Sequence, residues 1–265
     1  MIYKPKLRFK GYTDAWEQRK LGEMSIKVSS KNTNRLITET LTNSAEEGII
    51  SQTDYFDREI SNAENIEGYY VVEPDDFVYN PRISTKAPVG PINRNCLERK
   101  GIMSPLYTVF RTDDTVNKLF LEFYFKTSCW HSFMKYNGDS GARSDRFSIK
   151  NNLFFSMGIG MPLFEEQRKI GKFLEHVSTL ITLHQRKCDQ LKNVKKAMLE
   201  KMFPKNGSNV PQIRFKGYTD AWEQRKVLEL FRITRGYVLA STQIESMKTD
   251  ENPYPVYSSQ TKIKV

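Results

Sequence analysis

The sequence predicts an α+β protein in which a globular α/β domain is followed by a long coiled-coil-forming helix and then by a partial second globular domain. Three observations lead to this prediction. The thirteen residues RFKGYTDAWEQRK occupy positions 8–20 and recur at 214–226, an offset of 206 residues in a chain of 265. Apolar residues recur in three- and four-residue steps through residues 163–203, and segments typical of strands come before them. The expected boundaries are 1–160, 161–204 and 205–265.

The first domain contains signals for both strands and helices. Residues 68–80, GYYVVEPDDFVYN, combine β-branched and aromatic residues around a turn, which predicts strand, turn and strand. Residues 104–112 predict another strand. Residues 113–136 predict one helix capped by Asp113 or Asp114, and 136–147 form a glycine-containing basic loop.

The long helix is expected from Glu165 to Met202. Its 38 residues would extend roughly 57 Å at about 1.5 Å per residue. Glutamates favour its N-terminal end, and Pro204 ends it. Its opposite face is too charged for burial in a core, so a coiled coil with another long helix fits best. The expected helix-pairing residues are Ile170, Phe173, Val177, Leu180, His184, Leu191, Val194 and Met198.

The formal net charge of +10 is unevenly distributed. Residues 21–80 carry four basic and twelve acidic groups, whereas residues 81–150 carry twelve basic and six acidic groups. Segregated positive charge favours a polyanion such as double-stranded DNA as partner, because phosphate contacts dominate such binding. The alternative is a solvated basic surface without a partner.

Other composition features narrow the class of protein. The three cysteines and three histidines lie in no disulfide-like or metal-ligand spacing, so we expect no metal site. The sequence has neither a signal-peptide-like start nor a run of 18 apolar residues, which predicts a cytoplasmic protein without a membrane partner.

Two short motifs have residues in common with enzymes that act on DNA. Asn80 and Pro81 begin like the Asn-Pro-Pro-aromatic motif of amino-methyltransferases, but Arg82 and Ile83 follow, and no glycine-rich loop for S-adenosylmethionine comes after a strand. Asp75, Glu98 and Lys100 have the residue order of a magnesium-dependent nuclease, although their surroundings predict turns and loops. We therefore expect no catalytic residues, and an autonomous Mg²⁺-dependent nuclease is the alternative.

Polar side chains in basic loops are the candidates for DNA binding. Asparagine can pair with the edge of adenine and arginine with that of guanine, whereas lysines mostly hold phosphates. The candidates are Lys31, Asn32, Arg35, Asn80, Arg82, Lys86, Arg94, Arg99, Ser104, Tyr107, Arg143 and Arg146. Each could instead be a solvated loop residue.

Four segments resemble the specificity subunit (HsdS) of type I restriction-modification enzymes. They are WEQRKLGE at 16–23, DFVYN at 76–80, SPLYTVF at 104–110 and PLFEEQRKIGKFLEHVSTLI at 162–181. The last resembles the start of the family's central conserved helix, with Met161 in place of a first proline. The resemblance covers residues 5–203 and resumes at 211.

The resemblance implies a fold and a role. Two target-recognition domains would each read half of a bipartite DNA site, separated by two antiparallel helices. The subunit would be non-catalytic and would bind no cofactor itself. It would recruit modification subunits, which use S-adenosylmethionine to methylate adenine N6, and restriction subunits, which use ATP and Mg²⁺. An alternative is a half-subunit that only binds the methyltransferase.

The repeat predicts two similar halves. An offset of 206 residues leads us to expect about 410 residues for two full halves, so 265 residues would be a half-subunit or a truncated form. We then expect a homodimer through the long helix. Tyr12 and Trp16 of the first repeat are expected to be packing anchors.

Overall fold

The computed structural model describes residues 5–55, 63–140, 145–205, 207–232, 239–240 and 250. The chain divides into two compact units, Met1–Cys188 and Asp189–Val265. The division falls within one long helix.

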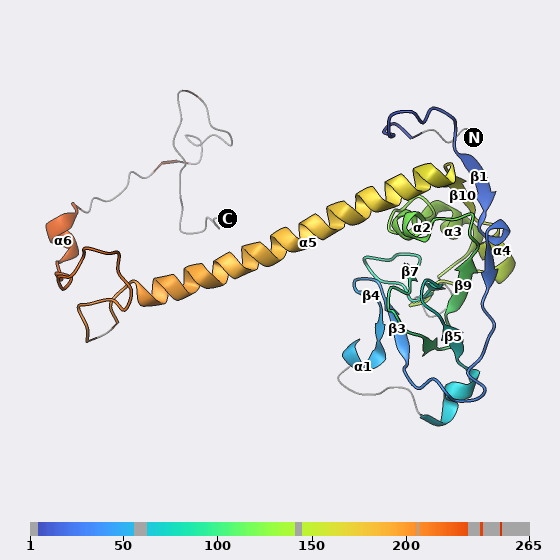
Figure 1. Cartoon of the computed structure of the whole chain (residues 1–265), viewed down its shortest axis with the longest axis horizontal. Helices are drawn as coiled ribbons and strands as arrows, with labels where there is room; N and C mark the ends of the chain where they lie inside the picture. The colour runs from blue at the N-terminus through green and yellow to red at the C-terminus, as the bar shows by residue number, and fades with distance from the viewer. Residues whose placement is uncertain are drawn as a thin grey trace. The chain divides into compact units, whose positions relative to one another are not determined.

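The first unit contains all the strands that the structure describes (Figure 1). The strands are β1 (Glu17–Lys20), β2 (Ser25–Lys27), β3 (Leu41–Ser44), β4 (Gly48–Ser51), β5 (Tyr70–Val72), β6 (Phe77–Tyr79), β7 (Ile92–Arg94), β8 (Gly101–Met103), β9 (Thr108–Thr112) and β10 (Gly158–Met161). The α-helices are α1 (Gln52–Tyr55), α2 (Lys118–Phe125), α3 (His131–Asn137), α4 (Asn151–Phe155), α5 (Phe164–Lys201) and α6 (Val227–Leu230). Short 3-10 helices cover Leu21–Glu23 and Ala63–Gly68.

A four-stranded antiparallel sheet, in the order β2-β9-β6-β7, organises the first unit. Three two-stranded pairs accompany it, namely β1-β10, β3-β4 and β5-β8. The central strands β6 and β9 are rich in β-branched and aromatic residues, which suit a buried pleated surface.

The two faces of this sheet bury different hydrophobic clusters. Phe77 of β6 stacks on Phe110 of β9 at 5.5 Å between ring centroids, and both belong to the larger cluster with helices α2, α3 and α4. The residues adjacent to these phenylalanines, Val78 in β6 and Val109 in β9, belong to the smaller cluster with β3, β5 and β8. Successive side chains of a strand point to opposite faces, so β6 and β9 contribute to both cores.

The predicted strands are confirmed, but their pairing is not that of a hairpin. Residues 68–80 contain β5, a turn and β6, and residues 104–112 contain β9. However, β5 pairs with β8, whereas β6 pairs with β7 and β9. A strand–turn–strand pattern therefore located the strands without giving their neighbours.

The prediction of one helix over 113–136 is wrong, because the structure has two. Helix α2 ends at Phe125 and α3 begins at His131, with Trp130 buried between them and its indole Nε1 donating to the Phe125 carbonyl oxygen at 3.1 Å. The cap of α2 is Asn117, whose Oδ1 accepts from the Phe120 amide at 3.0 Å, and not Asp113 or Asp114. Of the basic loop at 136–147, residues 141–144 lie outside the described part.

The long helix α5 confirms the prediction of 165–202 to within a residue. Its first turns join the first unit: Ile170 packs against the larger cluster, which corrects its assignment to the helix-pairing stripe. Gly171 lies where an added Cβ would approach Asn117 Oδ1 and the Phe120 amide at 3.1 Å, so α5 passes close to the start of α2. None of the described helices is long and apolar enough to cross a membrane.

The packing anchors predicted in the first repeat are confirmed. The Trp16 ring meets Phe120 edge-on at 5.9 Å and packs against the larger cluster. Lys169 of α5 places its ammonium 5.0 Å from the centroid of the Tyr12 ring. The first repeat thereby connects β1 to the start of α5.

Candidate nucleic-acid interface

An open groove of about 880 Å³ lies in the first unit, where several strands end. One side is formed by β3 and the turn after it, residues 42–47. The other is formed by residues 80–84, which follow β6, together with the turn before β9. Five of the twelve predicted DNA-binding residues line it: Asn80, Arg82, Ser104, Tyr107 and Arg146. We call this the recognition groove.

The floor of the recognition groove is held by an asparagine network. Asn43 is buried and donates to the Val78 carbonyl oxygen at 2.7 Å, while its own Oδ1 accepts from Asn93 at 2.7 Å. Asn80 donates to the Asn43 carbonyl oxygen at 2.8 Å. Because every amide group here has a partner, the floor is fixed before any ligand arrives.

Two arginines lie side by side on the groove. The backbones of Arg82 and Arg146 form an antiparallel β-bridge. Beside it, the Ile83 amide donates to the Asp145 carbonyl oxygen at 2.9 Å, and the Phe147 amide donates to the Pro81 carbonyl oxygen at 2.7 Å. Both side chains are exposed, and neither guanidinium has an ion pair among the described residues. An exposed guanidinium group without an ion pair can fork onto phosphate oxygens or onto guanine.

The remaining predicted residues of the groove are neutral. Tyr107 places its hydroxyl 3.4 Å from Thr42 Oγ1, and its amide donates to the Ser104 carbonyl oxygen at 3.1 Å. Asn80 also accepts from the Arg82 amide at 2.9 Å, so this side chain orders the backbone that carries Arg82. Asn80 is thus a positioning residue in this arrangement.

The rim of the groove carries acidic residues as well. Lys86 pairs with Glu46 at 2.9 Å, and both side chains are exposed. Glu47 lines the groove without an ion pair in the part of the chain that the structure describes. A carboxylate in such a place repels phosphate but can accept a hydrogen bond from cytosine N4.

The candidates at residues 31–35 do not line the groove, although the Asn32 amide donates to the carbonyl oxygen of Tyr69, a lining residue, at 3.0 Å. Asn32 is 1% exposed, and its amide exchanges hydrogen bonds with the backbone of Ile37 at 2.8 and 3.2 Å. This corrects its assignment to DNA binding, because the side chain orders its own loop. Arg35 pairs with Glu67 at 2.6 Å, and Lys31 is exposed.

Two further arginines are engaged in ion pairs. Arg94 lies between Glu122 and Asp75, with its Nε 2.8 Å from Glu122 Oε2. Burial acts to raise the pKa of Glu122, but Lys126 and Arg94 outweigh it and hold that pKa below its usual value. Arg99 forms a two-bonded pair with Glu39, both bonds at 2.6 Å. The ion pairs of Arg94 place it at the junction between the sheet and α2. Arg143, another predicted DNA-binding residue, lies outside the described residues.

Two of the three residues of the nuclease alternative, Asp75 and Lys100, are engaged in ion pairs. Asp75 is bound by Arg94 and Lys118, and Lys100 pairs with Glu73 at 2.7 Å. Burial acts to raise the pKa of Asp75, but hydrogen bonds from the two cations lower it overall. Within the described residues, no cluster of three or more His, Cys, Asp or Glu side chains could hold a metal ion.

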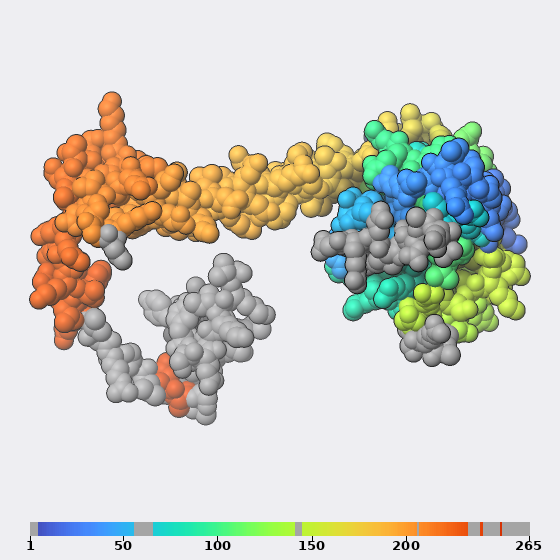
Figure 2. Space-filling model, turned by 90° about the horizontal axis from the view of Figure 1, so that it is seen from below, coloured from blue at the N-terminus to red at the C-terminus, as the bar shows by residue number. Residues whose placement is uncertain are grey.

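The apolar stripe of α5 is largely open to solvent in the part of the chain that the structure describes. Phe173, Leu180, Leu191 and Val194 are exposed, as is His184. Figure 2 shows the surface of the long helix in yellow to orange. Val177 is half-buried. Met198 instead lines a pocket of the second unit. An exposed apolar stripe at helical spacing is the feature that a paired helix covers.

Sequence reasoning missed two residues at the start of α5. Glu166 is 1% exposed and accepts from Arg8 at 2.9 and 2.6 Å. Gln167 accepts from the Asn117 amide at 2.8 Å and donates to the Pro162 carbonyl oxygen at 2.9 Å. The signal is a pair of adjacent polar residues in a helix's first turn; the helix dipole also favours Glu166 there, so the pattern does not indicate burial.

The comparisons with known proteins place two solved structures beside this chain. No known protein family matches the sequence, and no curated protein matches it. One structure, described as "Structural basis underlying complex assembly and conformational transition of the type I R-M system", is 15% identical with a TM-score of 0.49, covering 78% of this chain and 53% of its own. The HsdS subunit from Thermoanaerobacter tengcongensis is 17% identical with a TM-score of 0.43, covering 76% and 47%. The chain spans about half the length of these structures.

Proposed function

We propose that this protein is a sequence-specific DNA-recognition subunit of a type I restriction-modification complex. The observation that carries the proposal is the recognition groove, which is lined by two exposed arginines that have no ion pair among the described residues and by hydrogen-bonded asparagines. The sequence motifs that resemble HsdS supply the class of complex. In this role the chain is non-catalytic and directs adenine-N6 methylation and restriction by its partners.

The groove residues divide into two tasks under this proposal. Arg82 and Arg146 contact phosphate or guanine, because their side chains are exposed and have no ion pair within the part of the chain that the structure describes. Tyr107 and Ser104 contribute neutral hydrogen-bonding groups on the facing turn. Asn80 holds the backbone that presents Arg82.

The cofactors belong to partner subunits under the same proposal. Modification subunits supply S-adenosylmethionine for methyl transfer, and restriction subunits supply ATP and Mg²⁺. The present chain contributes the choice of DNA site, and its recognition domain reads one half of a bipartite sequence.

We further propose that α5 pairs with an antiparallel helix of a second molecule. The exposed apolar stripe requires a cover, and charge favours the antiparallel direction. Residues 184–201 carry six basic and two acidic groups, whereas residues 164–183 carry three of each. Antiparallel pairing keeps the two basic halves apart and opposes the helix dipoles.

Sedimentation tests the helix pair. Leu191→Lys should lower the dimer fraction at micromolar concentration, because it places a charge within the apolar stripe. Asn193→Lys, which adds the same charge on another side of the helix, is the matched control. A wild-type chain that sediments only as a monomer would contradict the pairing.

Methylome sequencing tests the recognition function. The chain is co-expressed with type I modification subunits, and the methylated sequence gives the motif, its symmetry and its spacer. If the arginine contacts a base, Arg82→Met and Arg146→Met should each weaken DNA binding by about 1–3 kcal/mol. If it contacts a phosphate, the slope of log binding constant against log salt concentration should become shallower by about 0.9. Lys135→Met, an exposed cation of α3, should change neither.

Two other outcomes identify the alternatives. DNA cleavage by the purified chain with Mg²⁺ alone would favour the autonomous nuclease. Unchanged DNA affinity in both arginine variants, with the methyltransferase still bound, would favour the half-subunit that serves assembly only.

A further inference from the structure

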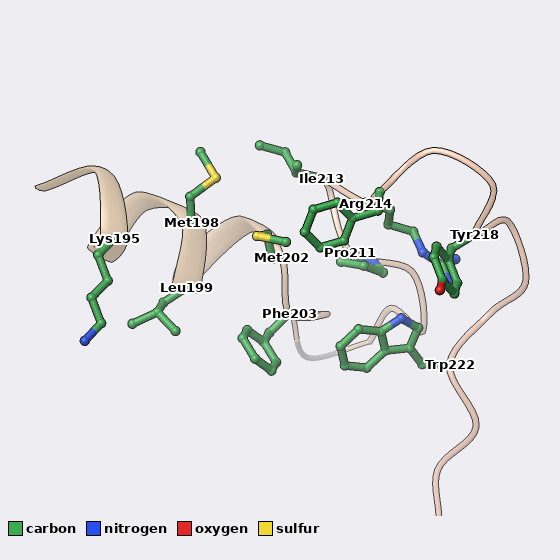
Figure 3. Close-up of a pocket in the computed structure, with 11 residues that line it drawn as sticks. Lys195, Met198, Leu199, Met202, Phe203, Pro211, Ile213, Arg214, Tyr218 and Trp222 are labelled. Carbon is green, nitrogen blue, oxygen red and sulfur yellow. The ribbon is translucent and has the colours of Figure 1, made fainter. Parts of the chain in front are cut away.

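An apolar pocket of about 380 Å³ lies in the second unit (Figure 3). It is lined by the last turns of α5 and by the second repeat, where Phe203 meets Trp222 edge-on at 5.8 Å. Hydrophobic burial is not directional, so such a lining does not select one ligand over another. The recognition groove, in contrast, carries polar and apolar side chains that can be matched to the edge of a base pair.

Three carboxamide side chains are among the described residues that line the recognition groove, and the fold uses two of them. Asn43 donates to the Val78 carbonyl oxygen at 2.7 Å, and Asn80 donates to the Asn43 carbonyl oxygen at 2.8 Å. The side chain of Gln52, in contrast, makes no hydrogen bond to any described residue, and its Oε1 is buried without a partner. A buried polar atom without a partner is unfavourable, and turning this amide toward a ligand breaks no hydrogen bond of the fold.

The β3–β4 hairpin places Gln52 at the groove. The Gln52 amide donates to the Thr40 carbonyl oxygen at 2.8 Å, which extends the ladder of the hairpin by one residue pair. On the neighbouring strand, Thr42 Oγ1 lies 3.4 Å from the Tyr107 hydroxyl. This contact joins the hairpin to the turn before β9, so side chains of both segments line one groove.

The turn before β9 presents an apolar side chain to the same groove. Leu106 lines the groove and is 58% exposed. Its turn is ordered, because Ser104 Oγ accepts from the Leu106 amide at 3.4 Å and the Ser104 carbonyl oxygen accepts from the Tyr107 amide at 3.1 Å. A leucine held in this way gains free energy when an apolar group of a ligand covers it.

An amide and an aliphatic side chain together match one kind of base pair. In the major groove adenine presents N7 as an acceptor and its N6 amino group as a donor, and a glutamine can bond to both. The thymine of the same pair presents its C5-methyl group, which an aliphatic side chain can cover. Guanine would instead place its O6 acceptor against the amide oxygen, and cytosine has no methyl group.

We propose that Gln52 and Leu106 form a base-reading subsite of the recognition groove that is specific for an adenine–thymine pair. Gln52 donates to adenine N7 through Nε2 and accepts from the N6 amino group through Oε1, while Leu106 covers the thymine methyl group. Arg82 and Arg146 remain available for phosphate or guanine. This inference rests on the proposed DNA-recognition function and adds the base pair that the subsite selects.

Base analogues test the subsite on labelled duplexes that carry the motif methylated by the wild-type complex. 7-Deazaadenine removes the N7 acceptor of adenine, and deoxyuridine lacks only the methyl group of thymine. Each analogue is placed at every adenine–thymine pair of the motif in turn, and anisotropy measures binding by the full chain in complex with its modification subunits. At one pair, 7-deazaadenine should weaken binding by roughly fivefold or more, and deoxyuridine by about fourfold.

Variants of the chain assign these responses to the two side chains. Gln52→Ala should bind the 7-deazaadenine duplex as well as the natural duplex, and Leu106→Ala should lose its response to deoxyuridine. Gln18→Ala, which replaces an exposed glutamine of β1, and Leu36→Ala, which replaces an exposed leucine, are the matched controls outside the groove. Both controls should keep both responses.

The outcomes separate the subsite from the recognition function. A wild-type complex that prefers the motif to a scrambled duplex, yet responds to neither analogue at any pair, would overturn the subsite alone. The same holds if Gln52→Ala or Leu106→Ala keeps the wild-type response to its own analogue. A wild-type complex that does not prefer the motif would contradict the recognition function itself, and the subsite with it.

Discussion

Arg94 provides a direct test of which arginines hold the fold together. Its guanidinium joins the sheet to α2, because it lies between Asp75 and Glu122 and is 17% exposed. In Arg94→Met, Glu122 keeps Lys126 at 2.6 Å and Asp75 keeps Lys118 at 3.1 Å. Breaking a buried ion pair costs about 3–5 kcal/mol. Because each carboxylate retains one cation, we expect a loss of about 2 kcal/mol in the free energy of unfolding.

Urea unfolding measures this loss. A Trp222→Phe background leaves Trp16 and Trp130, both in the first unit, as the fluorescent reporters. The double variant Arg94→Met/Glu122→Gln should cost less than the sum of its parts, because the neutral glutamine needs no cation. The slope with urea should stay unchanged, since the same surface is exposed on unfolding.

DNA binding separates the two roles. Below its unfolding transition Arg94→Met should bind DNA as the wild type does, whereas Arg82→Met should lose affinity and keep its stability. A change in unfolding free energy below about 0.5 kcal/mol, typical of neutral surface substitutions, would refute the structural role. A loss of affinity equal to that of Arg82→Met would return Arg94 to the DNA-reading set.

The remaining predictions concern stability. The pKa of Glu122 in the folded protein lies below its unfolded value of about 4.3. Its contribution to the free energy of unfolding is therefore present above that pH and is lost as the pH falls through the folded pKa. Arg94→Met should reduce this acid-dependent loss of stability, as measured by urea titrations from pH 6 to pH 3. Gly90→Ala should destabilise more than Gly48→Ala, because both glycines have positive φ but only at Gly90 would a Cβ lie 2.1 Å from a backbone oxygen; equal midpoints of thermal unfolding would contradict this. Asn117→Ala should cost about 1 kcal/mol in urea unfolding by removing the cap of α2, whereas Asn117→Asp should retain most of it, and equal losses would disprove the cap.

The helix and strand locations were predictable because they depend on local periodicity. The stripe along α5 and the β-branched runs of β6 and β9 report which face of each element is apolar. The partner of β5 is β8, about thirty residues away, and no local pattern specifies that pairing. Between α2 and α3 the buried Trp130 packs on Phe125 and donates to its carbonyl oxygen, a contact that the local apolar pattern does not specify.

The candidate site was predictable only by residue type. Arginines and asparagines in basic loops were expected to face DNA, and Arg82 and Arg146 do lie free on one groove. Arg99 does not, because Glu39 binds it from sixty residues away, and such a partner is invisible in a sequence window. Asn43 was missed because β3 has no strong alternation to mark it, although it holds the groove floor.

The repeat separates what sequence determines locally from what tertiary contacts add. Thirteen identical residues form the same glycine-centred turn twice, so the turn is encoded by the segment itself. Yet Arg8 is paired with a buried carboxylate while Arg214 is not, and the aromatic rings beside them are half-buried in one case and exposed in the other. The difference lies in the surface that each repeat meets, since the segment is constant. The turn is therefore encoded by the segment itself, whereas the ion pair of its arginine depends on a buried carboxylate, Glu166, that lies beside the first repeat.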